Sequence, residues 1–243
     1  MASPRWIKAI SNALNVPENK GKVVYQVATV DSHNLPHVRS QIHRGFITPK
    51  GSPNLPLLMT STDARSPKVV QMLSTPSVEL AWWMEGSQDQ FRISGRAFIV
   101  PPPDHAFHIM SDVPRGTALA VLDEKGEEGQ EGGKFDWEKK RREVFASMKP
   151  EMKASWCIPV APGSIIPSYD EVKKWPNSVP NIDEASTAED KNNWNEALSN
   201  FVLMVIEPVQ VDWVQLAPRP NRRTRFSRTD DAVFEWIEDI LVP

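Results

Sequence analysis

The sequence is short of the features on which several common kinds of protein depend. It holds a single cysteine among 243 residues, which excludes an intramolecular disulfide and a zinc site built from cysteines. It holds no run of about 20 apolar residues, so we expect no membrane-spanning helix. The net charge of −3 shows no basic excess, which argues against a nucleic-acid partner and restricts any anion site to a local cluster.

Familiar catalytic and nucleotide-binding motifs are missing as well. The chain contains no G-x-S-x-G motif, no phosphate loop of the G-x-x-x-x-G-K-[ST] type and no G-x-G-x-x-G motif. The five histidines show no metal-ligand spacing supported by carboxylates, so we predict no metal site. The single cysteine fits a reducing compartment. Because we expect no membrane anchor either, we predict a cytoplasmic protein.

What is present indicates short strands with helices between them. Apolar residues make up 40% of the chain, which is enough for a substantial core. Strand-like segments bounded by turn residues are expected at 22–30, 37–47, 55–60, 77–85, 89–100, 200–216 and 222–228. Helical spacing is expected at 5–15, 66–74, 101–110 and 136–148, with polar helices within 170–200. Because strands and helices do not alternate as βαβ units, we predict the α+β class, with an antiparallel barrel or sheet.

The segment "MTSTDARSPKVV" places hydroxyls and cations where a strand turns into a helix. Five of its side chains can contact an anion: Ser61, Thr62, Arg65, Ser66 and Lys68. The first turn of a helix offers free N–H groups and the positive end of the helix dipole, which favour an anion. Two interpretations stay open, because Asp63 or Ser66 can also cap the helix while both cations are solvated.

Three other stretches place polar side chains in apolar strands. They are "RSQIHR" with Arg39 and Arg44, "DQFRISG" with Gln90 and Arg92, and "WVQLAPRPNRRTRF" with Trp213, Arg219, Arg222, Arg223 and Arg225. A glutamine amide suits the edge of a heterocycle, and Trp with Arg suits a planar anion. A regular strand directs Arg39 and Arg44 to opposite faces. Each stretch can equally be the solvated face of an edge strand or hairpin.

Taken in order, the four stretches resemble the FMN-binding split-barrel family of pyridoxamine 5′-phosphate oxidases. That family carries R-x-V-L-L-K, Y-T-N-x-x-S-R-K and R-Q-V-R-x-x-G, and then W-Q-G followed by R-L-H-D-R. The spacing within "RSQIHR", "STDARSPK", "DQFRISG" and the C-terminal Trp and Arg residues follows these motifs. The resemblance covers residues 22–110 and 200–243, and it is poor between 111 and 199.

The resemblance implies an α+β fold: an antiparallel split β-barrel of six or more strands with peripheral helices. It implies one domain over residues 1–243, with insertions at about 114–136 and 170–196. It also implies a homodimer with FMN at the interface and a small-molecule substrate. The residues expected to hold FMN are Arg39, Arg44, Ser61, Thr62, Arg65, Ser66, Lys68, Gln90, Trp213 and Arg223, the last two contributed by the partner subunit. Arg219 is expected to orient the substrate.

Two departures from the family pattern affect the expected activity. Pro67 stands where the family has a second arginine of the phosphate region, and Asn221 replaces a histidine that contacts the substrate. Three functions therefore stay open. They are an oxidase acting on a vitamin B6 phosphate, an FMN-dependent reductase or oxidase of another small molecule, and a flavin-binding protein without catalytic activity.

Overall fold

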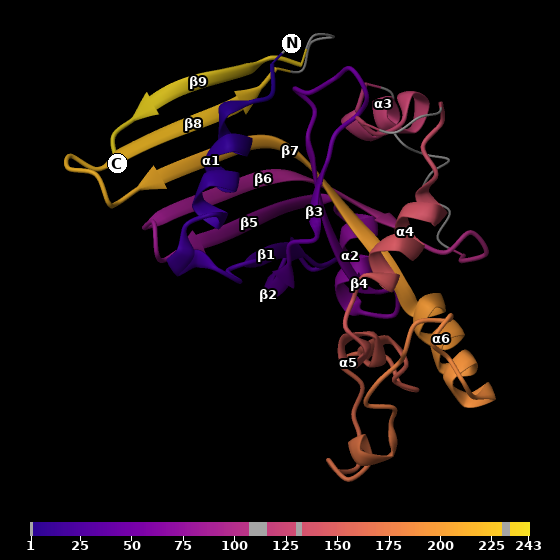
Figure 1. Cartoon of the computed structure of the whole chain (residues 1–243). Coiled ribbons are helices and arrows are strands. Elements are labelled where there is room, and N and C mark those ends of the chain that lie inside the picture. The colour runs from indigo at the N-terminus through magenta and orange to yellow at the C-terminus, as the bar shows by residue number, and fades with distance from the viewer. Residues whose placement is uncertain (1, 107–115, 130–132, 230–233) are drawn as a thin grey trace.

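A computed structural model describes residues 2–106, 116–129, 133–229 and 234–243. In this part of the chain nine antiparallel strands form one sheet, in the order β2-β1-β5-β6-β7-β4-β3, and β8 and β9 continue the sheet beyond the second half of β7 (Figure 1). The strands are β1 (Val24–Val30), β2 (Pro36–Ile42), β3 (Gly45–Ile47), β4 (Leu57–Asp63), β5 (Ser77–Met84), β6 (Asp89–Val100), β7 (Phe201–Gln215), β8 (Arg222–Arg228) and β9 (Trp236–Leu241). The α-helices are α1 (Arg5–Leu14), α2 (Pro67–Ser74), α3 (Ala118–Lys125), α4 (Trp137–Ala146), α5 (Pro150–Lys153) and α6 (Ala188–Asn200).

The sheet closes on itself through the connection between β2 and β3. β2 pairs with β1 at one end of the strand order and β3 pairs with β4 at the other, yet only His43 and Arg44 separate the two strands along the chain. The backbone N–H of His43 donates to the Val23 carbonyl (2.7 Å), whereas that of Arg44 donates to the Met59 carbonyl (2.8 Å). The chain thus steps from one sheet edge to the other within two residues. The single strand expected over 37–47 is therefore two strands.

Beyond this closure, α2 fills an opening between β2 and β4. The two strands meet at Ile42, whose carbonyl accepts the Thr60 hydroxyl (2.7 Å), but they do not pair. On one side of the opening Gln71 of α2 accepts a hydrogen bond from Thr29 of β1 (2.6 Å). On the other side α2 is hydrogen-bonded to β4. The barrel is therefore split at this point, and the helix joins the two sides of the split.

Two hydrophobic clusters lie on opposite faces of the sheet. The first fills the barrel and is closed by α1, whose Trp6 and Ile10 are fully buried. The second lies between the outer face of β4 and the first half of β7 on one side and α3, α4 and α6 on the other (Figure 1). β4 is buried at every position because it has a core on each side. This explains why its sequence "LLMTSTD" does not alternate between apolar and polar residues.

The outer face of the other half of the sheet is exposed. β1 and β5 alternate between buried and accessible positions, which is typical of an antiparallel sheet with one face toward a core. Among the accessible side chains are Val38 on β2, which is 65% exposed, and Trp83 on β5, which is 43% exposed. This exposed apolar surface lies on the side of the sheet opposite to the barrel interior.

Several expected elements differ from the observed ones. The helix expected at 101–110 is absent over its described residues 101–106, where consecutive prolines supply no N–H donors and keep the preceding residues out of the helical region; residues 107–110 lie outside the described part. α3 lies within the segment 114–136 that the resemblance implies to be an insertion, and the C-terminal segment forms the strand β9. A capping box opens α6, where Thr187 and Asp190 exchange hydrogen bonds. No described helix is both long and apolar enough to cross a bilayer.

The buried side chain of His43 in the barrel interior predicts how the stability of the protein depends on pH. His43 packs against the rings of Phe46 (4.7 Å between centroids) and Trp82 (4.9 Å), and its Nδ1 is buried with no hydrogen-bond partner among the described residues. Burial lowers the pKa of His43 to about 4, whereas an unfolded histidine has a pKa of about 6.5. The unfolded chain therefore binds one more proton between these values. We expect the free energy of unfolding to fall as the pH drops from about 6.5 to about 4, by up to about 3 kcal/mol.

Denaturant unfolding measured between about pH 7 and pH 4 tests this expectation. In His43→Phe the same part of the pH dependence should be missing. A variant whose stability depends on pH as steeply as that of the native chain would contradict the assignment to His43.

Candidate functional site

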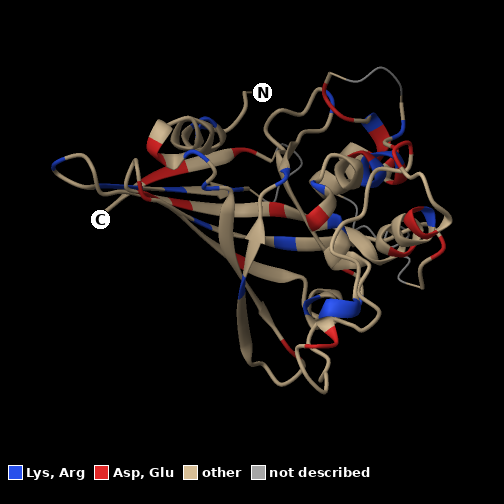
Figure 2. Ribbon diagram, turned by 60° about the horizontal axis from the view of Figure 1, so that its bottom comes forward, with Lys and Arg blue, Asp and Glu red and all other residues tan. Residues whose placement is uncertain are grey.

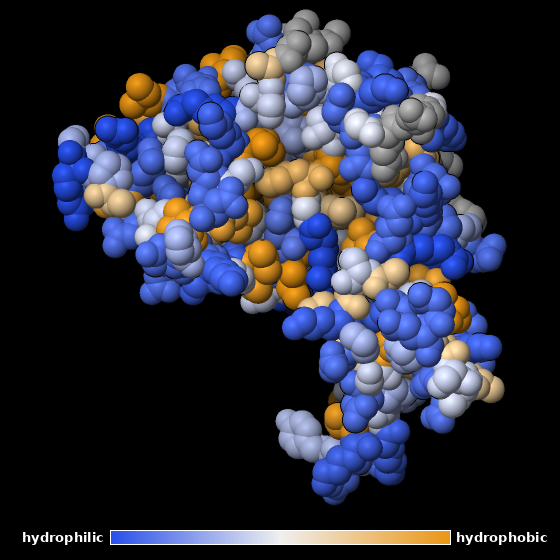
Figure 3. All heavy atoms as spheres, viewed as in Figure 1, coloured by the Kyte–Doolittle hydropathy of each residue, from blue (hydrophilic) through white to orange (hydrophobic). Residues whose placement is uncertain are grey.

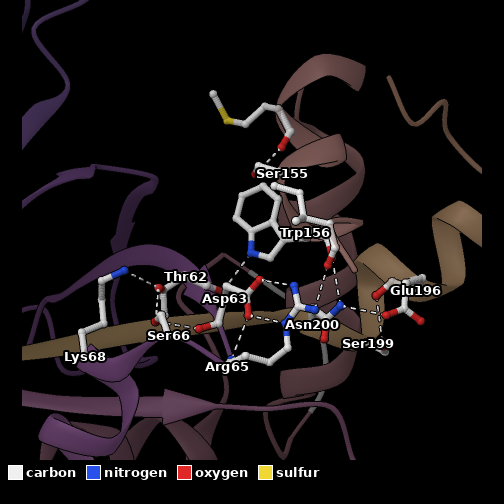
Figure 4. A network of polar contacts seen from close by, with 12 residues as sticks. Thr62, Asp63, Arg65, Ser66, Lys68, Ser155, Trp156, Glu196, Ser199 and Asn200 are labelled. Carbon is white, nitrogen blue, oxygen red and sulfur yellow. Dashed lines mark hydrogen bonds and ion pairs between the residues drawn. The ribbon is translucent and has the colours of Figure 1, made fainter. Parts of the chain in front are cut away.

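Hydroxyls and one ammonium group come together where β4 turns into α2 (Figure 4). The Lys68 Nζ donates to the Thr62 Oγ1 (2.9 Å), and the Thr62 and Ser66 hydroxyls share a hydrogen bond (3.3 Å). The Ser66 hydroxyl is also within hydrogen-bond distance of the Asp63 carbonyl (2.8 Å). Thr62 and Ser66 are buried, whereas Lys68 is half-buried. Pro67 opens the helix without an N–H group of its own, which suits the first helical position.

Arg39 reaches the same region from β2, on the other side of α2. Its Nη1 donates to the Thr29 Oγ1 (2.5 Å) and to the His37 carbonyl (2.9 Å), and its Nη2 donates to the Gln71 Oε1 (3.1 Å). Burial lowers the pKa of Lys68, and the charge of Arg39 lowers it further. The two cations are therefore close enough to repel each other. We call Arg39, Thr62, Ser66 and Lys68 the cation–hydroxyl cluster.

The described carboxylates form no ion pair with this cluster; Asp63 is near enough to raise the pKa of Lys68, but its own ion pair is with Arg65. Within the described residues neither Arg39 nor Lys68 forms an ion pair, and burial lowers the pKa of both groups because it penalises their charged forms. Two other arginines of the motifs do have such partners: Arg65 pairs with Asp63 (2.8 Å) and Arg223 pairs with Asp212 (2.7 Å). Unpaired positive charge beside buried hydroxyl donors fits an anion such as a phosphate group.

Arg44 and Ser61 lie on the other side of β4. Successive side chains of a strand point to opposite faces, so Ser61 faces away from Thr62 and toward the helices. The Arg44 Nε approaches the Ser61 Oγ at 3.4 Å, and its Nη2 lies 2.9 Å from the Met152 Sδ. The structure therefore separates these two predicted residues from the cation–hydroxyl cluster.

Arg65 anchors the segment that follows α5. Besides its pair with Asp63, it donates to the Ile158 carbonyl (2.8 Å). The Trp156 indole donates to the Thr62 carbonyl (3.0 Å), and the Asn200 amide donates to the Trp156 carbonyl (2.9 Å) (Figure 4). The guanidinium of Arg65 is thus occupied by these contacts within the chain.

Gln90 and Arg223 lie on the exposed outer face of the sheet. The register places Gln90 opposite Val214 and Val214 opposite Arg223, so the three residues form one row across β6, β7 and β8. Arg223 pairs with Asp212, whose carboxylate also accepts a hydrogen bond from Arg92 (2.6 Å). Charged groups of both signs are visible along these strands in Figure 2. This face is opposite to the one from which Arg39 extends.

Trp213 and Arg219 lie elsewhere. Trp213 packs nearly parallel to Phe91, with ring centroids 5.8 Å apart, and its indole donates to Asp89 (2.8 Å). It belongs to the barrel side of β7, so it does not share a face with Arg223 on the neighbouring strand. Arg219 is in the exposed loop between β7 and β8, where its Nη1 contacts the Leu216 carbonyl (3.3 Å) and the side chain of Asn221.

Two residues of the site, Thr29 and Gln71, are not among those expected from the sequence. Both contact Arg39 directly. Gln71 follows Lys68 by three positions on α2, which places both side chains on the same helix face. That spacing is visible in the sequence. No comparable signal indicates Thr29, because its proximity depends on strand pairing between β1 and β2.

Comparison with known proteins relates this geometry to one family. Residues 3–101 match the sequence model of the family described as pyridoxamine 5′-phosphate oxidase, FMN-binding domain. A curated relative, pyridoxine/pyridoxamine 5′-phosphate oxidase 2 of Arabidopsis thaliana, is 27% identical over 96 residues. That match covers 39% of this chain and 46% of the relative, so it spans less than half of either protein.

Two solved structures share the fold. A pyridoxamine 5′-phosphate oxidase-related, FMN binding protein from Nostoc punctiforme superimposes with a TM-score of 0.69 at 22% identity, covering 100% of both chains. PhzG from Burkholderia lata superimposes with a TM-score of 0.56 at 14% identity, covering 98% of this chain and 89% of that one.

The resemblance inferred from the motifs is thus confirmed, and so is the α+β split-barrel fold. The match over residues 3–101 contains the whole cation–hydroxyl cluster. The matched family model is described as FMN-binding, which bears out the expected cofactor. The roles of the individual site residues remain predictions.

The contacts of Arg65 predict a structural role that stability measurements can test. Replacing Arg65 by alanine leaves the buried carboxylate of Asp63 without its partner. We expect Arg65→Ala to lower the free energy of unfolding by about 2 kcal/mol. Lys173→Ala is the matched control, since Lys173 and Asp170 form an exposed pair and its loss should change stability by less than about 0.5 kcal/mol. Equal stability of the two variants in denaturant titrations would contradict this role.

Proposed function

We propose that this protein binds FMN and acts as an FMN-dependent oxidoreductase on a small molecule. The observation that carries the proposal is the cation–hydroxyl cluster, in which two cations and two buried hydroxyls meet and neither cation has an ion-pair partner among the described residues. The family match over residues 3–101 supports FMN as the source of the phosphate. Bound FMN supplies the two-electron redox chemistry.

The cation–hydroxyl cluster would hold the phosphate by charge and by hydrogen bonds. Arg39 and Lys68 supply cationic donors, and the hydroxyls of Thr62 and Ser66 supply neutral ones. The eight-residue helix α2 begins beside these hydroxyls, and its positive dipole end adds to the attraction for an anion. The phosphate would in turn offset the repulsion between the two cations.

We also propose that the flavin lies between two copies of the chain. Arg39 extends toward the inner side of the sheet, whereas Gln90 and Arg223 lie on its outer face. Two strands, β1 and β5, separate β2 from β6, which corresponds to roughly 14 Å at about 4.8 Å per strand. One flavin held by Arg39 would therefore meet Gln90 and Arg223 of a second copy. The exposed Val38 and Trp83 on the outer face fit such an interface.

Arg219 and its neighbour Asn221 bear on the choice of substrate. Arg219 would be the residue that orients it, but the Arg219 guanidinium contacts Asn221, which stands where the vitamin B6 oxidases have a histidine. PhzG was solved in complex with tetrahydrophenazine-1-carboxylic acid, so a protein of this fold takes a ligand other than a B6 vitamer. A small molecule other than pyridoxamine phosphate is therefore the second candidate. Turnover of pyridoxine or pyridoxamine phosphate under oxygen distinguishes the two.

The proposal predicts a flavin spectrum and its loss in one variant. Purified protein reconstituted with FMN should be yellow. Arg39→Ala should weaken FMN binding by about 1.5–3 kcal/mol, because it removes a charge-assisted contact to the phosphate. Equilibrium titration of the apoprotein with FMN measures this change. Arg142→Ala is the control, since Arg142 is an exposed arginine on α4 that pairs only with Glu138.

Titration with riboflavin, which lacks the phosphate, separates the phosphate contact from a general loss of structure. Arg39→Ala should bind riboflavin as the native chain does. Native protein that binds neither flavin, or Arg39→Ala with native affinity for FMN, would overturn the proposed function.

The two-copy site predicts complementation between variants. Arg39→Ala removes the phosphate contact, and Gln90→Trp places a bulky side chain where the flavin ring would lie. In a mixed dimer one site carries both changes and the other carries neither. After denaturation and refolding of a one-to-one mixture, we expect about a quarter of the sites to regain native FMN affinity. If the site is built within one copy, the mixture should bind no better than its separate components.

A further inference from the structure

Arg39 is held by neutral oxygen atoms. Its Nη1 donates to the Thr29 hydroxyl (2.5 Å), and its Nη2 donates to the Gln71 side-chain oxygen (3.1 Å). The Thr29 hydroxyl in turn donates to the same Gln71 oxygen (2.6 Å). These three side chains form a closed triangle that joins β2, β1 and α2. Because Thr29 is only 1% exposed, water competes little for these contacts.

The triangle fixes the orientation of the Gln71 amide. Its Oε1 accepts from two donors, and an amide NH2 group cannot accept from either of them. The oxygen therefore faces Arg39, and the Nε2 points away from Thr29 and Arg39. Gln71 lies one helical turn after Lys68, so one short helix carries both the second cation of the cluster and the residue that holds the first.

Because the Gln71 amide is neutral, it does not cancel the charge of Arg39 as a carboxylate would. Asp63 and Asp212 neutralise the arginines that they hold, Arg65 and Arg223. Gln71 restrains Arg39 through the same kind of oxygen contact but leaves its charge uncompensated. The guanidinium is thus fixed in place and still attractive to an anion.

We propose that Gln71 is a positioning residue for the phosphate group of FMN, acting through Arg39, and that its neutral amide is required for this role. The inference rests on the proposed function and deepens it. It predicts that removing the acceptor and charging the acceptor both weaken FMN binding, for two different reasons. Gln71→Met keeps the length of the side chain but releases Arg39. Gln71→Glu keeps both contacts but neutralises Arg39.

The test compares the FMN and riboflavin affinities of the apoproteins by equilibrium titration. We expect the dissociation constant for FMN to rise about tenfold in each variant, which is equivalent to about 1.4 kcal/mol. The constant for riboflavin should stay within about twofold, because riboflavin has no phosphate for Arg39 to contact. Thermal unfolding should show Gln71→Glu to be as stable as the native chain, so that its weaker binding is not a loss of fold.

Two further variants complete the design. Val70→Met places the same new side chain at an exposed neighbouring position of α2 and should leave both affinities unchanged. In the Arg39→Ala background, Gln71→Met should add less than about a twofold effect, because the residue it positions is already gone.

Each outcome decides between the two proposals. If Arg39→Ala weakens FMN binding but both Gln71 variants bind FMN as the native chain does, the role of Gln71 is wrong and the proposed function stands. A parallel loss of riboflavin and FMN affinity in Gln71→Met would show that Gln71 only supports the fold. If Arg39→Ala leaves FMN affinity unchanged, the phosphate site itself is wrong, and the inference about Gln71 is overturned with it.

Discussion

Two like charges, Arg39 and Lys68, are kept close together in the split of the barrel, and the rest of the site is arranged around that constraint. Burial disfavours the charged form of both groups, and each cation raises the energy of the other. Hydrogen bonds to neutral oxygen atoms on β1, β2, β4 and α2 hold the two side chains in place. The folded chain thus keeps two cations close together without an ion-paired carboxylate among the described residues, an arrangement whose repulsion an anion can relieve.

The split itself follows from the way in which the sheet closes. A two-residue step carries the chain from β2 to β3, so the barrel is tight at His43 and Arg44 and opens toward Arg39. α2 fits into that opening because its buried Val69 and Met72 pack into the barrel core, while Lys68 contacts β4 and Gln71 contacts β1 and β2. The helices on the far side of β4 hold the strand from behind through Arg65 and Trp156. The site is therefore supported by both hydrophobic clusters, although its polar groups face only one of them.

Carboxylate partners distinguish Arg65 and Arg223 from Arg39. Asp63 and Asp212 hold Arg65 and Arg223 within the chain, whereas Arg39 is held by hydroxyl, carbonyl and amide oxygens. All three arginines lie within motifs that resemble those of the oxidase family, so motif membership alone does not distinguish them. Asn221 stands where the resembled C-terminal motif has a histidine, so the match to the family motifs is incomplete in this loop.

The sequence by itself determined the class of fold, the resemblance to the oxidase family and the cluster at 61–68, because these depend on local order: turn residues, strand alternation, and hydroxyls and cations at a helix start. Only the tertiary structure decided which side of the sheet each predicted residue occupies. Ser61 and Thr62 are neighbours in sequence but face opposite cores, and Trp213 and Arg223 are on paired strands but on opposite faces. Strand register and the break at His43 set these directions, and both arise from pairing between distant segments. For the same reason the sequence does not indicate Thr29 as a site residue: its hydroxyl lies against Arg39 because β1 pairs with β2.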